Sequence, residues 1–171
     1  MGYPRKDICF TAGLLVDIGQ ILLNNAADDI YPALIMEARE NNFDIKDAES
    51  QVFGFNHQDI GNKLSQHWKL PLLYQNAIHY HHSPEVAFNN VPPEDFKLIM
   101  SVYAANQMSP LFTENPRLLN FDMTLFKHCG IIATPQQFVE RFEPQFNDIM
   151  LEVIKVSDMM FGASASNKVA A

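Results

Sequence analysis

The stretch AGLLVDIGQILL, residues 12–23, places one carboxylate, Asp17, inside an otherwise apolar run. The three- and four-residue spacing of one helix face joins Phe10, Leu14, Asp17 and Ile21. We therefore expect a helix over residues 6–24 with Asp17 on its inward face. A buried carboxylate is costly unless it meets a counter-charge, hydrogen-bond donors or a metal ion. Its partners should lie elsewhere in the chain.

Composition limits the class of protein before any motif is considered. The 171 residues are 47% hydrophobic and 19% charged, which is enough apolar material for one packed domain. The formal net charge is −8 and the 12 Lys and Arg are scattered, which argues against a nucleic-acid partner. Cys9 and Cys129 fit neither a disulfide framework nor a zinc ribbon. With no leader and no long apolar span recognised, we expect a cytoplasmic protein without membrane association.

The rest of the chain has helical periodicity and no hairpin signal, so we expect an all-α protein. Further helices are predicted over residues 30–40, in a short segment that stops at Gly54, after an N-cap at Asn56, between Pro71 and His82, and from Pro93 onward. Within the helix that follows Asn56, one inward face should carry His57, Ile60, Leu64 and Trp68. We expect one domain over residues 1–162, with motifs in 8–112 and carboxy-terminal helices in 116–162, followed by a flexible tail at 163–171.

The carboxy-terminal part adds two helix signals. A short segment is expected near Leu125, and TPQQ at 134–137 reads as a capping box. Pro144 should split or kink the helix that follows. Its apolar stripe, expected to be core packing, contains Phe138, Phe142, Phe146, Ile149, Val153 and Val156.

Polar side chains on inward helix positions are the candidate functional residues. They are Asp17, His57, the His81/His82 pair and Asn106, each on a different predicted helix. His81 continues the stripe of Leu73 and Ala77, so it is the expected inward member of its pair. Imidazole and carboxylate groups from several helices could hold a metal ion. They could equally satisfy one another in a structural network that fixes helix register.

Four phrases carry a resemblance to a known family. FTAGLLVDIGQILL, FGFNHQDIGNKLSQHWKLP, AIHYHHSP and SVYAANQM resemble, in order and spacing, the HDOD family, a bacterial signalling relative of the HD-domain phosphohydrolases. The resemblance covers residues 8–112 and implies an HD-type helical bundle and a regulatory role. Family members normally carry a preceding helical half, which nothing in this chain matches. We therefore expect the amino end to be a cut through a longer domain.

The resemblance also implies what became of the metal site of active relatives. Their His-Asp pair falls on Val16 and Asp17, and their later metal-binding aspartate falls on Asn106. Val16 and Asn106 are therefore degenerate ligand positions. The ligands that remain are Asp17, His57 and one of His81 or His82. We expect no catalytic residue and no cofactor, in a non-catalytic regulatory or protein-interaction module of bacterial signal transduction. The alternative is a residual metal-dependent phosphohydrolase that uses these residues with Mn, Mg or Fe.

Assembly is the last expectation from sequence. The first helix carries more apolar positions than one face needs, among them Ile8, Cys9, Ala12, Leu15 and Ile18. Exposed apolar patches often mark association sites. We therefore expect a homo-oligomer formed through this helix, besides a protein partner whose identity the sequence does not give. In the rival arrangement the carboxy-terminal helices cover the helix and the chain is a monomer.

Overall fold

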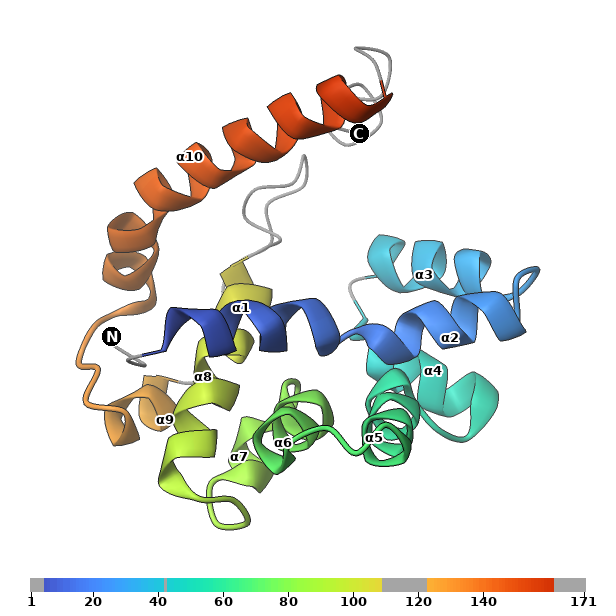
Figure 1. Ribbon diagram of the computed structural model, residues 1–171, viewed down its shortest axis with the longest axis horizontal. Coiled ribbons are helices and arrows are strands. Elements are labelled where there is room, and N and C mark those ends of the chain that lie inside the picture. The colour runs from blue at the N-terminus through green and yellow to red at the C-terminus, as the bar shows by residue number, and fades with distance from the viewer. Residues whose placement is uncertain (1–4, 42, 109–122, 162–171) are drawn as a thin grey trace. The chain divides into compact units, whose positions relative to one another are not determined.

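The computed structural model describes residues 5–41, 43–108 and 123–161. Within these ranges all regular secondary structure is α-helical and no strand occurs (Figure 1). The prediction of an all-α helical bundle is therefore confirmed. The chain divides into two compact units, residues 2–103 and residues 104–171. The expected single domain over 1–162 stays a prediction, and the expected tail at 163–171 lies outside the described residues.

The apolar run of residues 12–23 forms parts of two helices. Helix α1 spans Lys6–Leu15 and α2 spans Ile18–Ala26, with a turn between them. The expected single helix over residues 6–24 is therefore wrong. Asp17 takes φ −96° and ψ 14° at the N-cap of α2, and its carbonyl accepts a short-range bond from the Gln20 N–H at 2.9 Å. Hydrophobic periodicity continues across this turn, so it gave no sign of the break.

The inward face of α1 and α2 also differs from the prediction. Phe10, Leu14 and Ile21 are 70%, 67% and 57% exposed, so the stripe expected to face inward points outward. The buried positions are Ile8, Ala12, Val16, Gly19 and Leu23. Both faces of this run are apolar, and spacing alone therefore could not choose between them. Of the positions expected to be in excess on the surface, Ile8 and Ala12 are buried.

One segment bears on the expectation of a protein without membrane association. The segment Lys6–Ala26 contains an 18-residue window with a mean hydropathy of 1.4, so it is long and apolar enough to span a membrane by length and composition. This segment differs from the expectation that the chain contains no long apolar span. One such helix near an amino terminus is weak evidence, since core helices and signal sequences share these properties.

Helices α3, Tyr31–Glu40, and α4, Ile45–Phe53, follow the sequence prediction closely. The Asp44 side chain caps α4 by accepting from the Lys46 N–H, and Gly54 ends it at φ 77°, where a glycine is favoured. Leu23, Tyr31 and Leu34 form a buried apolar cluster under these helices. Partly buried side chains of Ile35, Ile45, Ala48, Phe53 and Ile60 pack against it.

Helix α5, His57–His67, packs against both α2 and α6, Leu72–Tyr80. The predicted N-cap at Asn56 is confirmed, and Asp59 completes a capping box. Trp68, expected on the core face, is instead 52% exposed because α5 ends one residue before it and it lies in the terminal turn. A four-residue helix, α7 (Pro84–Ala87), follows α6 and had not been predicted.

The last three helices are α8 (Pro93–Met108), α9 (Met123–His128) and α10 (Pro135–Phe161). The capping box at the start of α10 is confirmed by reciprocal bonds between Thr134 and Gln137. Pro144 does not split the helix, which runs through it. Ile149 is 58% exposed, so this member of the expected stripe is not a core residue. The side chains of Phe138, Phe146, Val153 and Val156 lie outside the described residues.

Candidate functional site

The close crossing of α2 and α5 brings the polar residues of the first unit together. A Cβ on Gly19 would lie 2.0 Å from the His57 carbonyl oxygen, so only glycine allows this backbone approach. Gly61 makes a second close contact, because a Cβ there would lie 2.8 Å from the Ile78 side chain. Asp17, two residues before Gly19, is thereby brought beside the first turn of α5.

His57 and His81 form the buried centre of the cluster, and both are 0% exposed. His57 opens α5, where the capping box of Asn56 and Asp59 holds the first turn. His81 ends α6 as its C-cap, and its Nδ1 lies 2.8 Å from the Ile78 carbonyl oxygen. The Nε2 atoms of the two rings are 3.3 Å apart. His81 is therefore the inward histidine of the pair, as its stripe predicts, while the His82 side chain keeps 16% exposure.

Asp17 meets both imidazoles from the rim of the cluster. Its Oδ1 lies 3.4 Å from His81 Nε2 and 3.7 Å from His57 Nε2, and its side chain is 48% exposed. The Gln20 amide donates to the same oxygen at 3.1 Å. Burial raises the pKa of Asp17, but the His81 ring, with His57 and His82, outweighs that effect and lowers the pKa below its usual value. The carboxylate inside the apolar run thus has histidine partners.

Glu49 is a buried member of the cluster that sequence reasoning missed. This α4 residue is 0% exposed, and its Oε2 accepts from the His57 backbone N–H at 2.8 Å and lies 2.7 Å from His57 Nδ1. The Tyr31 hydroxyl donates to Oε1 at 2.5 Å. Burial, followed by the hydrogen bond to Glu49, raises the pKa of Tyr31. The only signal in the sequence was an acidic residue eight positions before His57, which by itself indicates nothing.

His82 has a carboxylate of its own at the edge of the cluster. Its Nδ1 lies 3.6 Å from Asp44 Oδ2, and its ring meets that of His57 edge-on at a centroid distance of 5.0 Å. Burial raises the pKa of Asp44, but the His82 ring beside it outweighs that effect and lowers the pKa to about 2. Asp44, which also caps α4, is a further residue that the sequence did not single out.

The donor atoms fit a metal ion by their spacing. One ligand atom from each of Asp17, His57, His81 and His82 lies within 4.8 Å of the others. A tetrahedral ion with bonds of about 2.0–2.1 Å needs donor separations of about 3.3–3.4 Å, because a tetrahedron's edge is about 1.6 times its centre-to-corner distance. The triangle of 3.3, 3.4 and 3.7 Å lies near that value, whereas hydrogen bonds measure about 2.7–3.2 Å.

The two positions expected to be degenerate are Val16 and Asn106. Val16 is 1% exposed and contributes an apolar side chain to the core. Asn106 is partly exposed and belongs to the second unit. The sequence prediction therefore found Asp17, His57, His81 and His82 in one place and did not find Glu49, Tyr31 or Asp44.

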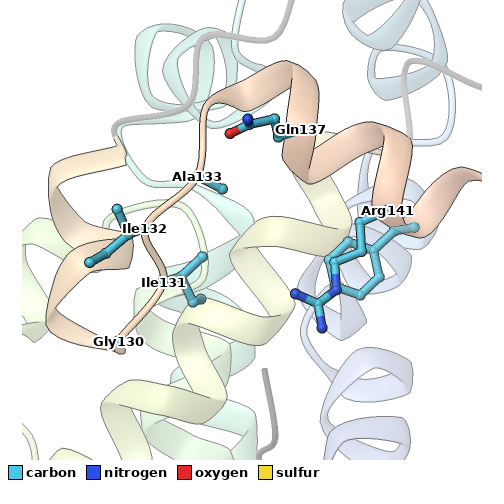
Figure 2. A pocket seen from close by; sticks show the side chains of 7 residues that line it. Gly130, Ile131, Ile132, Ala133, Gln137 and Arg141 are labelled. Atoms are coloured by element: carbon cyan, nitrogen blue, oxygen red, sulfur yellow. The ribbon is translucent and has the colours of Figure 1, made fainter.

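A hollow in the second unit offers less chemistry. It has a volume of about 450 Å³ and lies between the segment of residues 130–133 and the first turns of α10 (Figure 2). Arg141 is its one charged lining residue, and Gln137 already serves the cap of α10. The lining has no imidazole, carboxylate or thiol, so it provides neither a metal ligand nor a general base.

Comparison with known proteins supports the resemblance over part of the chain. Residues 1–84 match the HDOD domain. The match includes Asp17, His57, His81 and His82 and stops before Asn106, so it is shorter than the expected range of 8–112. An uncharacterized protein of Treponema pallidum (strain Nichols) is 27% identical over 107 residues, which are 61% of this chain and 20% of that protein. The chain thus spans about a fifth of that relative's length. No solved structure matches it.

Proposed function

We propose, because residues 1–84 belong to the HDOD family, that the chain is a non-catalytic regulatory or protein-interaction module of bacterial signal transduction. One observation carries the proposal. Val16, in the position of the histidine of the His-Asp pair in active relatives, is an apolar residue packed at 1% exposure. A buried valine has no atom that can ligate a metal ion. The partners of the Asp17 carboxylate are then the side chains of His57 and His81.

The test is an assay of hydrolysis. The purified chain would be incubated with cyclic dinucleotides, with nucleotides and with a generic phosphodiester, each in the presence of Mn²⁺, Mg²⁺ or Fe²⁺. We expect no turnover above that of the Asp17→Ala variant. Turnover that this substitution abolishes would contradict the proposal.

The second candidate is a residual metal-dependent phosphohydrolase. The donor triangle of Asp17, His57 and His81 favours it, since three protein ligands with an open position are the usual arrangement of catalytic metal sites. Asp17 and the two imidazoles would hold the ion, and the ion would supply an activated water. Of the metals expected from the sequence, Mg²⁺ suits this site least, because it prefers an octahedral shell of oxygen ligands. Mn and Fe are better matches for two imidazoles and one carboxylate.

The module proposal includes association with other chains in the cytoplasm. The outward stripe of α1 and α2, formed by Phe10, Leu14 and Ile21, provides exposed apolar surface for a homo-oligomer or a protein partner. Light scattering of the chain and of Leu14→Glu would test this. We expect a doubled mass that falls to about 19 kDa in the variant. A mass near 19 kDa for the unchanged chain would contradict the oligomer.

A further inference from the structure

Glu49 has an arrangement that packing alone does not require. It is a carboxylate at 0% exposure, and each of its oxygens is engaged. Oε1 accepts from the Tyr31 hydroxyl, and Oε2 accepts from the backbone N–H at the start of α5. The same Oε2 lies 2.7 Å from Nδ1 of the His57 ring. A chain of contacts thus runs from α3, through α4, to one ring nitrogen in the cluster.

These contacts decide which nitrogen of each imidazole carries hydrogen. A carboxylate accepts hydrogen bonds and does not donate them, so Nδ1 of His57 must be the N–H donor to Glu49. A carbonyl oxygen likewise only accepts, so Nδ1 of His81 must donate to Ile78. With one proton on each ring, Nε2 then carries a lone pair that a cation can accept. The two lone pairs face each other across 3.3 Å, and neither ring can donate to the other. A second proton on His81 would instead lie on Nε2, which is 3.4 Å from Asp17 Oδ1.

We propose that Glu49, braced by Tyr31, is the positioning residue of this cluster: it holds His57 so that Nε2 of His57, Nε2 of His81 and Oδ1 of Asp17 form a three-donor face for one divalent transition-metal cation. Histidine ligands commonly donate their second ring nitrogen to a carboxylate or a carbonyl, which fixes the ring and raises its basicity. Here His57 has the carboxylate and His81 has the carbonyl. The inference rests on the geometry of the site and holds whether the bound cation is structural or catalytic.

Two further observations agree with a cation rather than a closed network. The distances from Asp17 Oδ1, 3.4 and 3.7 Å, exceed those of hydrogen bonds but approach the donor spacing of a tetrahedral ion. A dication would also offset the negative charge of Asp17 directly and that of Glu49 through the His57 ring. The Asp17 side chain is 48% exposed, so solvent reaches the three-donor face on that side.

The experiment uses the full chain, purified without chelator, and Co²⁺ as a spectroscopic probe. We expect one Co²⁺ per chain with the strong visible absorption of a tetrahedral complex, displaced by Zn²⁺. Glu49→Gln keeps the size of the side chain but removes its charge, and it should weaken Co²⁺ binding by about 10–100-fold. Asp44→Asn is the matched control, since it changes the carboxylate beside His82 but not the three-donor face, and its affinity should stay within about twofold. Circular dichroism would establish that each variant is folded.

A second readout separates positioning from a purely structural role. Nitrogen NMR of the metal-free chain should show His57 protonated at Nδ1, and Glu49→Gln should redistribute the proton between the two ring nitrogens. If that variant does not fold, Tyr31→Phe keeps Glu49 and should weaken Co²⁺ binding by several-fold. The inference is overturned if the unchanged chain binds no stoichiometric Co²⁺ or Zn²⁺, or if the folded Glu49→Gln variant binds as the parent does.

The same samples distinguish this inference from the proposed function. Metal binding together with phosphodiester hydrolysis would overturn the non-catalytic proposal and leave the role of Glu49 intact. A chain that neither binds metal nor hydrolyses substrate would overturn the inference and leave the regulatory proposal standing.

Discussion

Helices α1 and α2 come from one apolar run, yet their glycines have opposite surroundings. A Cβ on Gly13 in α1 would meet nothing within 4 Å, whereas a Cβ on Gly19 in α2 would lie 2.0 Å from the backbone of His57. Figure 1 shows the two helices following one another, with α5 beneath α2. Within the described part of residues 2–103, the side of α1 that carries Gly13 is open, and the α2–α5 side that carries the cluster is closely packed. The same residue type permits a backbone contact in one helix and only adds flexibility in the other.

The largest effect should come from filling the packed side. Gly19→Ala places a methyl group against the His57 carbonyl, and because the obstacle is backbone, α2 and α5 must move apart. We expect a loss of about 3 kcal/mol or more in the free energy of unfolding, measured by urea denaturation. The displacement of His57 should also abolish Co²⁺ binding.

Gly13→Ala is the matched change on the open side. It should raise the free energy of unfolding by about 0.5–1 kcal/mol, because alanine is the better helix former and no atom opposes its Cβ. Equal losses at the two positions would show that the contrast between the two helices is wrong.

Tyr31→Phe tests whether the packed side depends on its buried hydrogen bonds. The change leaves Glu49 Oε1 buried without its donor, which should cost about 2 kcal/mol of unfolding free energy in the same denaturation experiment. Tyr80→Phe is the control, since no hydrogen bond of its hydroxyl is found in the described part of the chain, and it should change stability by less than about 0.5 kcal/mol. A Tyr31 variant as stable as the Tyr80 variant would show that the hydrogen bond from Tyr31 to Glu49 does not stabilise the fold.

The contrast between the open side of α1 and the packed side of α2 and α5 also explains what the sequence could and could not predict. Helix ends were found where a local signal exists, as at Asn56 with Asp59 and at Gly54, because capping depends on neighbours in the chain. The break at Asp17 and the inward face of α1 and α2 were missed, because both faces are apolar and the choice depends on which side α5 and α6 cover. Asp17, His57 and His81 could be singled out as polar residues on helix stripes. Glu49 could not, since its partner His57 reaches it only through the folding of α4 onto α5.

At the edge of the cluster a smaller, pH-dependent effect is expected from Asp44. The pKa of its carboxyl falls from 3.8 to about 2 in the folded chain, so its contribution to stability is complete above the unfolded value and disappears as the pH drops toward 2. Its side chain is 36% exposed, which limits the contribution to about 1 kcal/mol. Asp44→Asn preserves the cap of α4, because asparagine also caps well.

The measurement is urea denaturation of both proteins between pH 5 and pH 2. The stability difference between parent and Asp44→Asn should be largest at pH 5 and vanish at the acid end of this range. A difference that stays constant across it would show that Asp44 has no charged partner in the folded chain.

The smallest effect is expected at the exposed end of α5, away from its buried first turn. Lys69 has φ 55°, in the left-handed region where side chains are strained, and it directly follows the C-cap residue Trp68. The Leu70 N–H closes the helix end on the Ser65 carbonyl at 3.0 Å, the pattern in which glycine is favoured at the preceding position. Lys69→Gly should therefore raise the free energy of unfolding by about 0.5 kcal/mol, because relief of strain exceeds the added flexibility of the unfolded chain.

Lys63→Gly, inside the same helix, should instead lower the free energy of unfolding by about 1 kcal/mol. Thermal and urea unfolding of the pair would check the prediction, and a loss of stability in both variants would show that the strain at Lys69 is negligible.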